Sequence, residues 1–157
     1  MSSDTRPQAP AGGDQAADGH DPDAYVSAEL YARIQQFYAD QMGLMDDGHA
    51  EAWAATFTED AVFLGAVAGR EALTASARAH SEKLLREKAD FRHWLGMLDV
   101  RPQPDGSLRT RAYALTARTV RGEALRITAS VVCRDHLVLQ DGRWLVSHRS
   151  LQRDGSS

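Results

Sequence analysis

The sequence contains a single cysteine, Cys133, among 157 residues. One cysteine excludes an internal disulfide and a thiolate-bound metal cluster, and it is typical of proteins of the reducing cytoplasm. No apolar run approaches the roughly 18 residues that a membrane-spanning helix needs. The first 22 residues also lack the apolar segment of a signal peptide. We therefore expect a cytoplasmic protein that makes no membrane contact.

Motifs for bound cofactors are missing too. No glycine-rich phosphate loop follows a predicted strand, and no Gly-x-Ser-x-Gly sequence occurs. The six histidines are dispersed, without the spacings His-x-His or His-x-x-x-His that commonly hold a metal. Any catalysis is therefore expected to use the side chains of the protein itself, with no metal and no cofactor.

Charge is unevenly placed along the chain, although the formal net charge is only −4. All ten basic residues after position 100 are arginines, and most of them, such as Arg109 and Arg111, alternate with other residues in predicted strands. That alternation is typical of a solvated sheet face. The negative net charge and the scarcity of aromatic residues among these arginines argue against a nucleic-acid partner.

The overall composition, with 43% hydrophobic and 25% charged residues, indicates an ordinary globular protein long enough to bury a core. Residues 1–24 are rich in alanine, glycine, aspartate and proline. This bias predicts a disordered leader, followed by a single domain at residues 25–153.

Helical and strand patterns divide that domain into two halves. Apolar spacing of three to four predicts a long helix over residues 26–45, which ends near Gly48, and further helices in AEAWAATF and over residues 69–90. Between the last two, TEDAVFLG is predicted to form a brief strand. Alternating or apolar segments then predict strands at residues 91–100, 108–120, 125–139 and 143–152, the last two joined by an Asp-Gly turn. Helices followed by a meander predict an α+β fold with the helices on one side of a curved sheet.

The predicted strand FRHWLGMLDV, residues 91–100, places His93 on the same face as Leu95 and Met97 if its side chains alternate regularly. An imidazole on an apolar face has two explanations. It is either a core histidine that is hydrogen-bonded to the backbone or the working group of a pocket, where a pKa near 6.5 suits proton transfer. The residues alone leave both open.

Three segments, in their order and spacing, resemble the NTF2-like superfamily and, within it, the SnoaL-like proteins: MDDGHAEAWAATFTEDAVF, FRHWLGMLDV and DGRWLVSHRSLQRD. The resemblance implies a cone-shaped barrel, in which N-terminal helices pack against a curved, mostly antiparallel sheet and enclose a pocket. Members include scytalone dehydratase, polyketide cyclases, limonene epoxide hydrolase and the non-catalytic small subunits of ring-hydroxylating dioxygenases. The fold alone therefore does not decide the function.

The resemblance also implies that Asp46 and His93 occupy the places of the catalytic aspartate and histidine of scytalone dehydratase. The rest of that site does not carry over, because Met45 replaces its tyrosine, and Arg118 and Cys133 fall near its second histidine and its asparagine. We hypothesise that His93 moves a proton and that Asp46 orients it. The alternative for Asp46 is a solvated residue of a turn.

Four further residues are predicted to contact a substrate: Tyr38, Trp53, Met97 and Arg118. Arg118 would stabilise developing negative charge if it points inward, and would join the solvated arginines if it points outward. The alternative for Tyr38 is core packing. His148 and Arg149, in the last strand, are expected to brace the sheet or a subunit contact.

The leading hypothesis is a cofactor-independent cyclase, dehydratase or isomerase acting on a small, largely apolar substrate, such as a polyketide intermediate of secondary metabolism. A non-catalytic subunit or ligand-binding module, like a dioxygenase small subunit, is one alternative. An epoxide hydrolase, with Asp46 and Arg118 about a water, is another. Open sheet faces in this fold usually pair, and ITASVVC carries an aliphatic stripe, so we also predict a homodimer.

Overall fold

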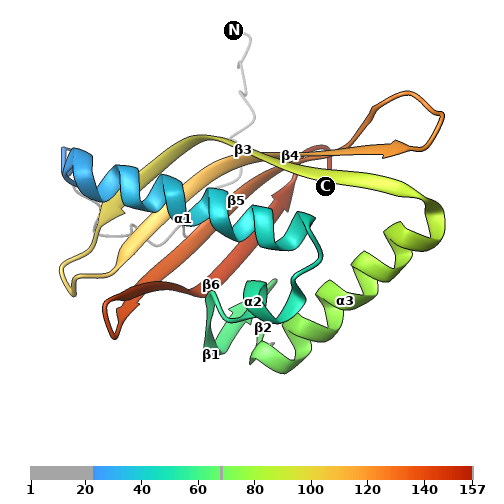
Figure 1. Cartoon of the computed structure of the whole chain (residues 1–157). Coiled ribbons are helices and arrows are strands. Elements are labelled where there is room, and N and C mark those ends of the chain that lie inside the picture. Colours follow the sequence, from blue (N-terminus) through green and yellow to red (C-terminus); the bar gives the residue numbers. More distant parts are fainter. Residues whose placement is uncertain (1–22, 68, 157) are drawn as a thin grey trace, which may run out of the picture.

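Three helices and six strands make up the described part of the chain, residues 23–67 and 69–156 of a computed structural model (Figure 1). The helices are α1 (Ala28–Asp46), α2 (Ala50–Ala54) and α3 (Gly69–Glu87). The strands are β1 (Phe57–Phe63), β2 (Ala66–Val67), β3 (Ala89–Pro102), β4 (Leu108–Val120), β5 (Arg126–Gln140) and β6 (Arg143–Arg153). Of the predicted leader, residues 1–24, all but the last two residues lie outside the described part.

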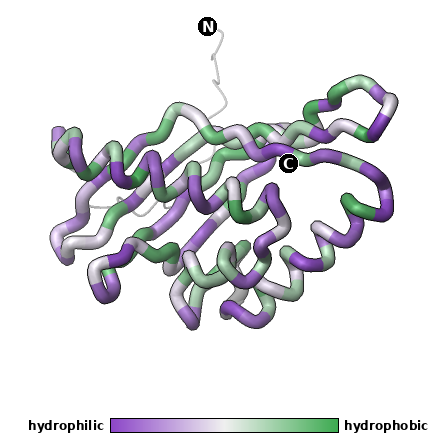
Figure 2. Tube along the Cα trace, in the orientation of Figure 1, coloured by the Kyte–Doolittle hydropathy of each residue, from purple (hydrophilic) through white to green (hydrophobic). Residues whose placement is uncertain are grey.

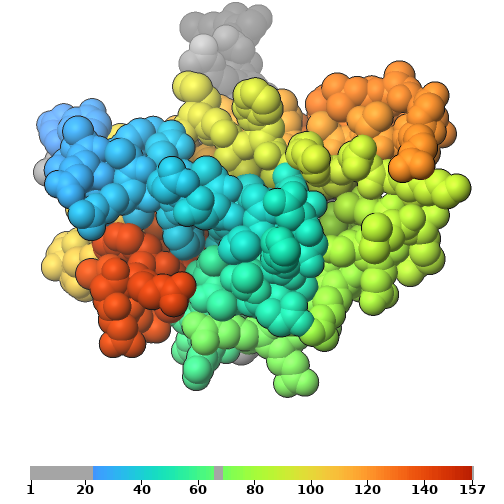
Figure 3. Space-filling view, viewed as in Figure 1, coloured from blue at the N-terminus to red at the C-terminus, as the bar shows by residue number. Residues whose placement is uncertain are grey.

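The strands form one sheet in the order β2-β1-β6-β5-β4-β3. Every neighbouring pair is antiparallel except β1 and β6, which run parallel. The helices lie on one face of the curved sheet, and their side chains form much of the surface on that side (Figures 1 and 3). The predicted α+β cone with a mostly antiparallel sheet is confirmed, although β2 and β3 remain as edges and the sheet is not closed.

Helix α1 begins and ends where local sequence signals place its termini. Ser27 caps the N-terminus, where its Oγ accepts a hydrogen bond from the backbone N–H of Leu30 at 3.1 Å. Gly48 follows the last helical residue, Asp46, by two positions and has a φ of +80°, a left-handed conformation that costs glycine little. Because the helix stops there, Asp46 comes to lie beside strand β3.

The β5–β6 hairpin contains the Asp-Gly turn expected from the sequence. Asp141 and Gly142 have φ values of 50° and 74°. Positive φ at both central residues is the geometry of a type I′ turn, whose twist suits a two-residue hairpin. In the resulting ladder, Asp135 of β5 stands opposite Arg149 of β6.

Strand β3 does not alternate regularly along its whole length. Its pairing with β4 shifts register between Gly96 and Asp99, so the strand contains a bulge. Met97, within the bulge, has a φ of 53° and is 73% exposed. The prediction that Met97 shares the inward face with His93 is therefore wrong, because the bulge breaks the alternation on which it rested. The predicted contact of Met97 with a substrate loses its structural basis.

The hydrophobic core lies between the helices and the inner face of the sheet. Hydrophobic and hydrophilic residues alternate along α1 and α3, as expected for helices with one buried side (Figure 2). The outer face of the sheet carries exposed aromatic and aliphatic side chains: Trp94, Tyr113, Leu115 and Ile127. Among the described residues, no helix combines the length and the apolar character needed to cross a membrane.

Candidate functional site

A cavity of about 360 Å³ lies between the helices and the inner face of the sheet. Most of its wall is aliphatic or aromatic, including Trp53 of α2 and Leu95 of β3. Hydroxyl, thiol, imidazole and guanidinium groups come from five lining residues: Ser76, Thr116, Cys133, His93 and Arg149. No aspartate or glutamate of the described chain lines it. A largely apolar wall with a few convergent polar groups is typical of a small-molecule site.

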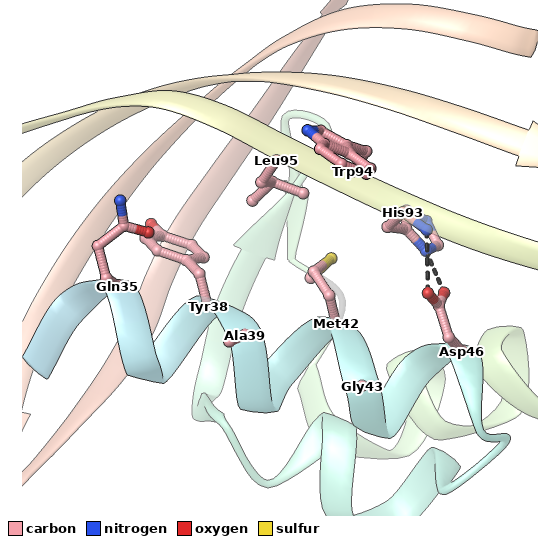
Figure 4. Close-up of a pocket in the computed structure, with 9 residues that line it drawn as sticks. All are labelled: Gln35, Tyr38, Ala39, Met42, Gly43, Asp46, His93, Trp94 and Leu95. Carbon is pink, nitrogen blue, oxygen red and sulfur yellow. Dashed lines mark hydrogen bonds and ion pairs between the residues drawn. The ribbon is translucent and has the colours of Figure 1, made fainter. Parts of the chain in front are cut away.

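Asp46, at the end of α1, accepts two hydrogen bonds from His93 on β3 (Figure 4). Its Oδ1 lies 2.6 Å from Nδ1 of the ring, and its Oδ2 accepts from the backbone N–H of His93 at 2.9 Å. The two side chains are 9% and 21% exposed, respectively. The carboxylate thus fixes both the strand position and the ring orientation of the histidine.

The pairing also decides where the proton of a neutral His93 ring resides. A carboxylate can only accept hydrogen bonds, so Nδ1 carries the hydrogen and Nε2 keeps its lone pair. No described residue hydrogen-bonds to Nε2. His93 lines both the cavity and a groove between α1 and β3, so Nε2 is the atom available to take a proton from a bound molecule.

A second histidine, His80, contacts the same aromatic ring as His93. Phe91 makes edge-to-face contacts with His80 of α3 and with His93, at ring-centroid distances of 4.9 Å and 5.1 Å. Burial, followed by the charge of His93, lowers the pKa of His80. The structure half-buries His80 beside β3.

A buried polar network lies beneath the cavity and was not predicted as a site. Arg149 donates from Nε to Oδ1 of Asp135 at 2.8 Å and from Nη2 to Oδ2 at 2.6 Å, and Nη2 also donates to Oε1 of Gln41 at 2.6 Å. Tyr38 donates from its hydroxyl to Oδ2 of Asp135 at 2.8 Å and contacts Thr110 at 2.6 Å. The network ties α1 to three adjacent strands of the sheet, β4, β5 and β6.

Burial and charge fix the protonation states around this network. Burial alone lowers the pKa of Arg149, but the charge and hydrogen bonds of Asp135 outweigh it, and the pKa lies well above its usual range. Burial, and then the charge of Asp135, raises the pKa of Tyr38 well above its usual value. Burial raises the pKa of the Cys133 thiol to about 12. Arg149 is therefore a permanent cation, and neither Tyr38 nor Cys133 is an anion at neutral pH.

The chain matches one known protein family over most of its length. A family model described as the SnoaL-like domain matches residues 26–150. The chain belongs to the SnoaL-like family. The match covers five strands in full and most of β6, and nearly all of the described residues, so the resemblance read from the three short segments is confirmed.

Solved structures of SnoaL-like relatives share the fold over most of their length. Aln2 from a Streptomyces species is 36% identical, with a TM-score of 0.76, over 82% of this chain and 93% of its own. ActVI-ORFA from Streptomyces coelicolor is 30% identical, with a TM-score of 0.78, over 83% and 99%. A Catenulispora acidiphila protein in complex with S-DNPA is 34% identical, with a TM-score of 0.71, over 82% and 96%. No curated protein matches the chain.

The SnoaL-like cavity gathers some of the predicted residues and not others. Trp53 lines it, with a buried Nε1 that has no hydrogen-bond partner among the described residues. Tyr38 belongs to the buried network and lines the outer α1–β3 groove, which Met42 and Leu95 share with the cavity (Figure 4). Arg118 lies outside both spaces.

Arg118 occupies the inner face of β4, opposite Phe91, but it sits towards the end of the strand. There it donates from Nη2 to Oε2 of Glu87, at the end of α3, at 2.6 Å. The prediction of a pocket cation at Arg118 is therefore not matched, because its charge is paired outside the cavity. Of the two residues considered for epoxide hydrolysis, Asp46 pairs with His93 and Arg118 pairs with Glu87.

Metal ligands do not converge in the described chain. No group of three or more histidine, cysteine, aspartate or glutamate side chains within residues 23–67 and 69–156 is placed to hold a metal ion. The chemistry that these residues can perform themselves is proton transfer at His93, beside an apolar cavity with one guanidinium in its wall.

Proposed function

We propose that this SnoaL-like protein is a cofactor-independent enzyme that catalyses a cyclisation, dehydration or isomerisation of a small, largely apolar, polyketide-like molecule. His93 is the general base and acid, and Asp46 is its positioning residue. The observation that carries the proposal is the double hydrogen bond of Asp46 to His93 at the wall of an apolar cavity.

The proposed chemistry starts with Nε2 of His93 removing a proton from an activated C–H or O–H group of the bound molecule. The charge of Asp46 then stabilises the imidazolium that forms, and the same ring returns the proton at the atom where the product needs it. The apolar wall favours the reaction because it excludes water from the developing charges. A relative solved with S-DNPA supports a small molecule as the ligand.

Carbon-bound proton exchange tests this proposal without knowledge of the natural substrate. 2-Tetralone is a bicyclic ketone with acidic C–H bonds, and proton NMR in D₂O follows the loss of their signal. The wild-type protein should accelerate exchange over buffer. His93→Gln and Asp46→Asn should each lower that acceleration about 100-fold or more, the usual contribution of a positioned acid–base group.

His148→Asn is the matched control, because His148 is an exposed histidine in the same sheet. It should exchange protons at the wild-type rate, and all variants should keep the wild-type circular dichroism spectrum. If His93→Gln exchanges as fast as the wild type, His93 is not the base. Wild-type protein that binds bicyclic ketones but exchanges no faster than buffer is a binding module instead.

We also propose that the active form is a homodimer that pairs the outer sheet faces. Trp94 and Leu115 stand directly opposite each other on β3 and β4, and they are 74% and 39% exposed. Sedimentation velocity at micromolar concentration should show a dimer, and Leu115→Glu should give a monomer. Lys83→Glu should not, because Lys83 is exposed on helix α3, on the other side of the sheet. A wild-type monomer under these conditions contradicts the pairing.

A further inference from the structure

The ion pair of Arg149 with Asp135 uses the Nε and Nη2 edge of the guanidinium and leaves Nη1 without a hydrogen-bond partner in the described chain. Nε and Nη2 serve Asp135, and the remaining Nη2 hydrogen serves Gln41. Nη1 donates to no described residue. In the described chain, the side-chain polar atoms that are both fully buried and without a partner are Trp53 Nε1 and Thr58 Oγ1. Nη1 of Arg149 has no partner there and is not one of these two atoms, so it is not fully buried. Nη1 therefore remains accessible, on a side chain that lines the cavity.

Asp135 does not block this group, because its own oxygens are already occupied. Oδ1 accepts from Nε of Arg149 at 2.8 Å and lies 3.5 Å from Sγ of Cys133. Oδ2 accepts from Arg149 and from the hydroxyl of Tyr38. The carboxylate is 0% exposed and the guanidinium is 5% exposed. Arg149 lines the cavity and Asp135 does not, so the cation is the partner that meets the cavity.

The remaining wall of the cavity strengthens this asymmetry. Apart from His93, its other hydrogen-bonding groups, at Ser76, Thr116 and Cys133, are neutral, and within the described chain no carboxylate lines it. A fixed donor that bears positive charge, in apolar surroundings, binds an anionic oxygen more strongly than a neutral one. Three residues hold the guanidinium in place: Asp135 and Gln41 through three hydrogen bonds, and Phe57 through the face of its ring at 5.2 Å. Little side-chain entropy is therefore lost on binding.

We propose that the cavity binds a carboxylate-bearing substrate and that Nη1 of Arg149 anchors that carboxylate. The inference rests on the proposed function, since it takes the cavity of His93 as the substrate site. His93 lies on β3 and Arg149 on β6, with β4 and β5 between them. Strands are about 4.8 Å apart, so the two groups are separated by on the order of 14 Å along the curved sheet. The carboxylate is therefore remote from the reacting carbon, on a molecule of more than one ring.

A matched pair of probes isolates the charge. 2-Naphthoate and 2-naphthamide have nearly the same shape, and only the first is an anion at neutral pH. In isothermal titration calorimetry, the wild-type protein should bind the naphthoate at least about tenfold more tightly than the amide, the usual advantage of a charged hydrogen bond. Equal affinities, or no binding of naphthoate at millimolar concentration, overturn the proposal.

The variant that tests the residue replaces both charges, Arg149→Met with Asp135→Asn, so that no uncompensated charge is left buried. It should bind the two probes with equal affinity. Arg118→Met is the control, because Arg118 is an arginine of the same sheet face tied to Glu87, and it should keep the wild-type preference. A double variant that keeps the preference shows that Arg149 is only a structural cation.

Failure of this inference is distinguishable from failure of the proposed function. His93→Gln should lose proton exchange and keep the preference for naphthoate, because the anchor is a different residue on a different strand. A protein that exchanges protons without any preference has a neutral substrate. A protein that prefers naphthoate but exchanges no protons is an anion-binding module.

Discussion

Replacement of Asp135 by asparagine should destabilise the fold more than any other single loss of charge in the described chain. The Asp135 side chain is 0% exposed, and it receives hydrogen bonds from Nε and Nη2 of Arg149 and from the hydroxyl of Tyr38. Asparagine keeps the shape but loses the charge and turns one oxygen into a donor. The guanidinium, 5% exposed, is then left buried without its counter-charge.

The magnitude follows from the cost of an unpaired buried ion. Removal of one partner of a buried ion pair costs about 3–5 kcal/mol, a large part of the 5–15 kcal/mol that stabilises a typical domain. For a domain of this size, each kcal/mol lowers Tm by about 2–4 °C, so the expected loss is roughly 6–20 °C. Asp60→Asn is the control, because Asp60 is exposed on β1, and it should change stability by less than about 0.5 kcal/mol.

Urea unfolding, followed by tryptophan fluorescence, measures both variants. One fixed protein concentration is used, because the stability of the proposed dimer would depend on concentration. The double variant Asp135→Asn with Arg149→Met should recover much of the loss, because it removes both charges. Two results refute the reasoning. One is a cost below about 1 kcal/mol for Asp135→Asn; the other is a double variant whose loss equals the sum of the two single losses.

Three further predictions concern separate parts of the molecule. Burial, and then the charge of His93, lowers the pKa of His80 in the folded state below its value of about 6.5 in the unfolded chain. The unfolded state therefore binds more protons below about pH 6.5, so stability should be full above that pH and fall below it. His80→Gln should flatten part of that fall in urea midpoints, and an unchanged slope contradicts the assignment. Burial raises the pKa of the Cys133 thiol to about 12, so iodoacetamide at about pH 8 should label Cys133 only when urea unfolds the protein. Mass spectrometry measures the labelling, and rapid labelling of the folded protein contradicts this prediction. Leu95→Ala should lower the free energy of unfolding by about 2 kcal/mol, because Leu95 packs against the core. Met97→Ala should change it by less than about 0.5 kcal/mol, because Met97 is 73% exposed. Equal losses in chemical unfolding contradict the bulge.

Local patterns were sufficient for most of the fold. The strand alternation, the Asp-Gly turn and the Gly48 stop each act over a few residues, so their physical cause is visible in the sequence. The Asp46–His93 contact joins a helix end to a strand 47 positions later. It was predictable only because the family resemblance supplied the long-range pairing that local patterns do not contain.

The rest of the site depends on contacts that spacing does not encode. Gln41 and Arg149 are 108 positions apart, and the sequence of β6 alone does not show which of its cations turns inward. Register decides it, because Arg149 stands opposite the buried Asp135. One usable signal was present: an aspartate inside the apolar run VVCRDHLVL needs a cationic partner if it faces the core.

Arg118 and Met97 show the two ways in which strand parity misleads. Arg118 does lie on the inner face, but its neighbour there is Glu87 of α3, so the correct parity put it beside a helix end and not in the cavity. Met97 has the wrong parity, because one bulge shifts the register of β3. Parity identifies a face of the sheet, whereas the helices packed on that face decide which part of it forms the cavity.

The parallel pairing of β1 with β6 has a consequence for how the protein is made. β1 ends at Phe63, and its partner begins at Arg143. At a synthesis rate of about 5–20 residues per second, β1 waits on the order of ten seconds for β6. During that time Phe57, 0% exposed in the finished fold, lacks the strand that carries Arg149 across its ring. A nascent chain interrupted before β6 therefore exposes an unpaired strand edge and an aromatic core to chaperones and proteases, and the cavity forms only when the two strands meet.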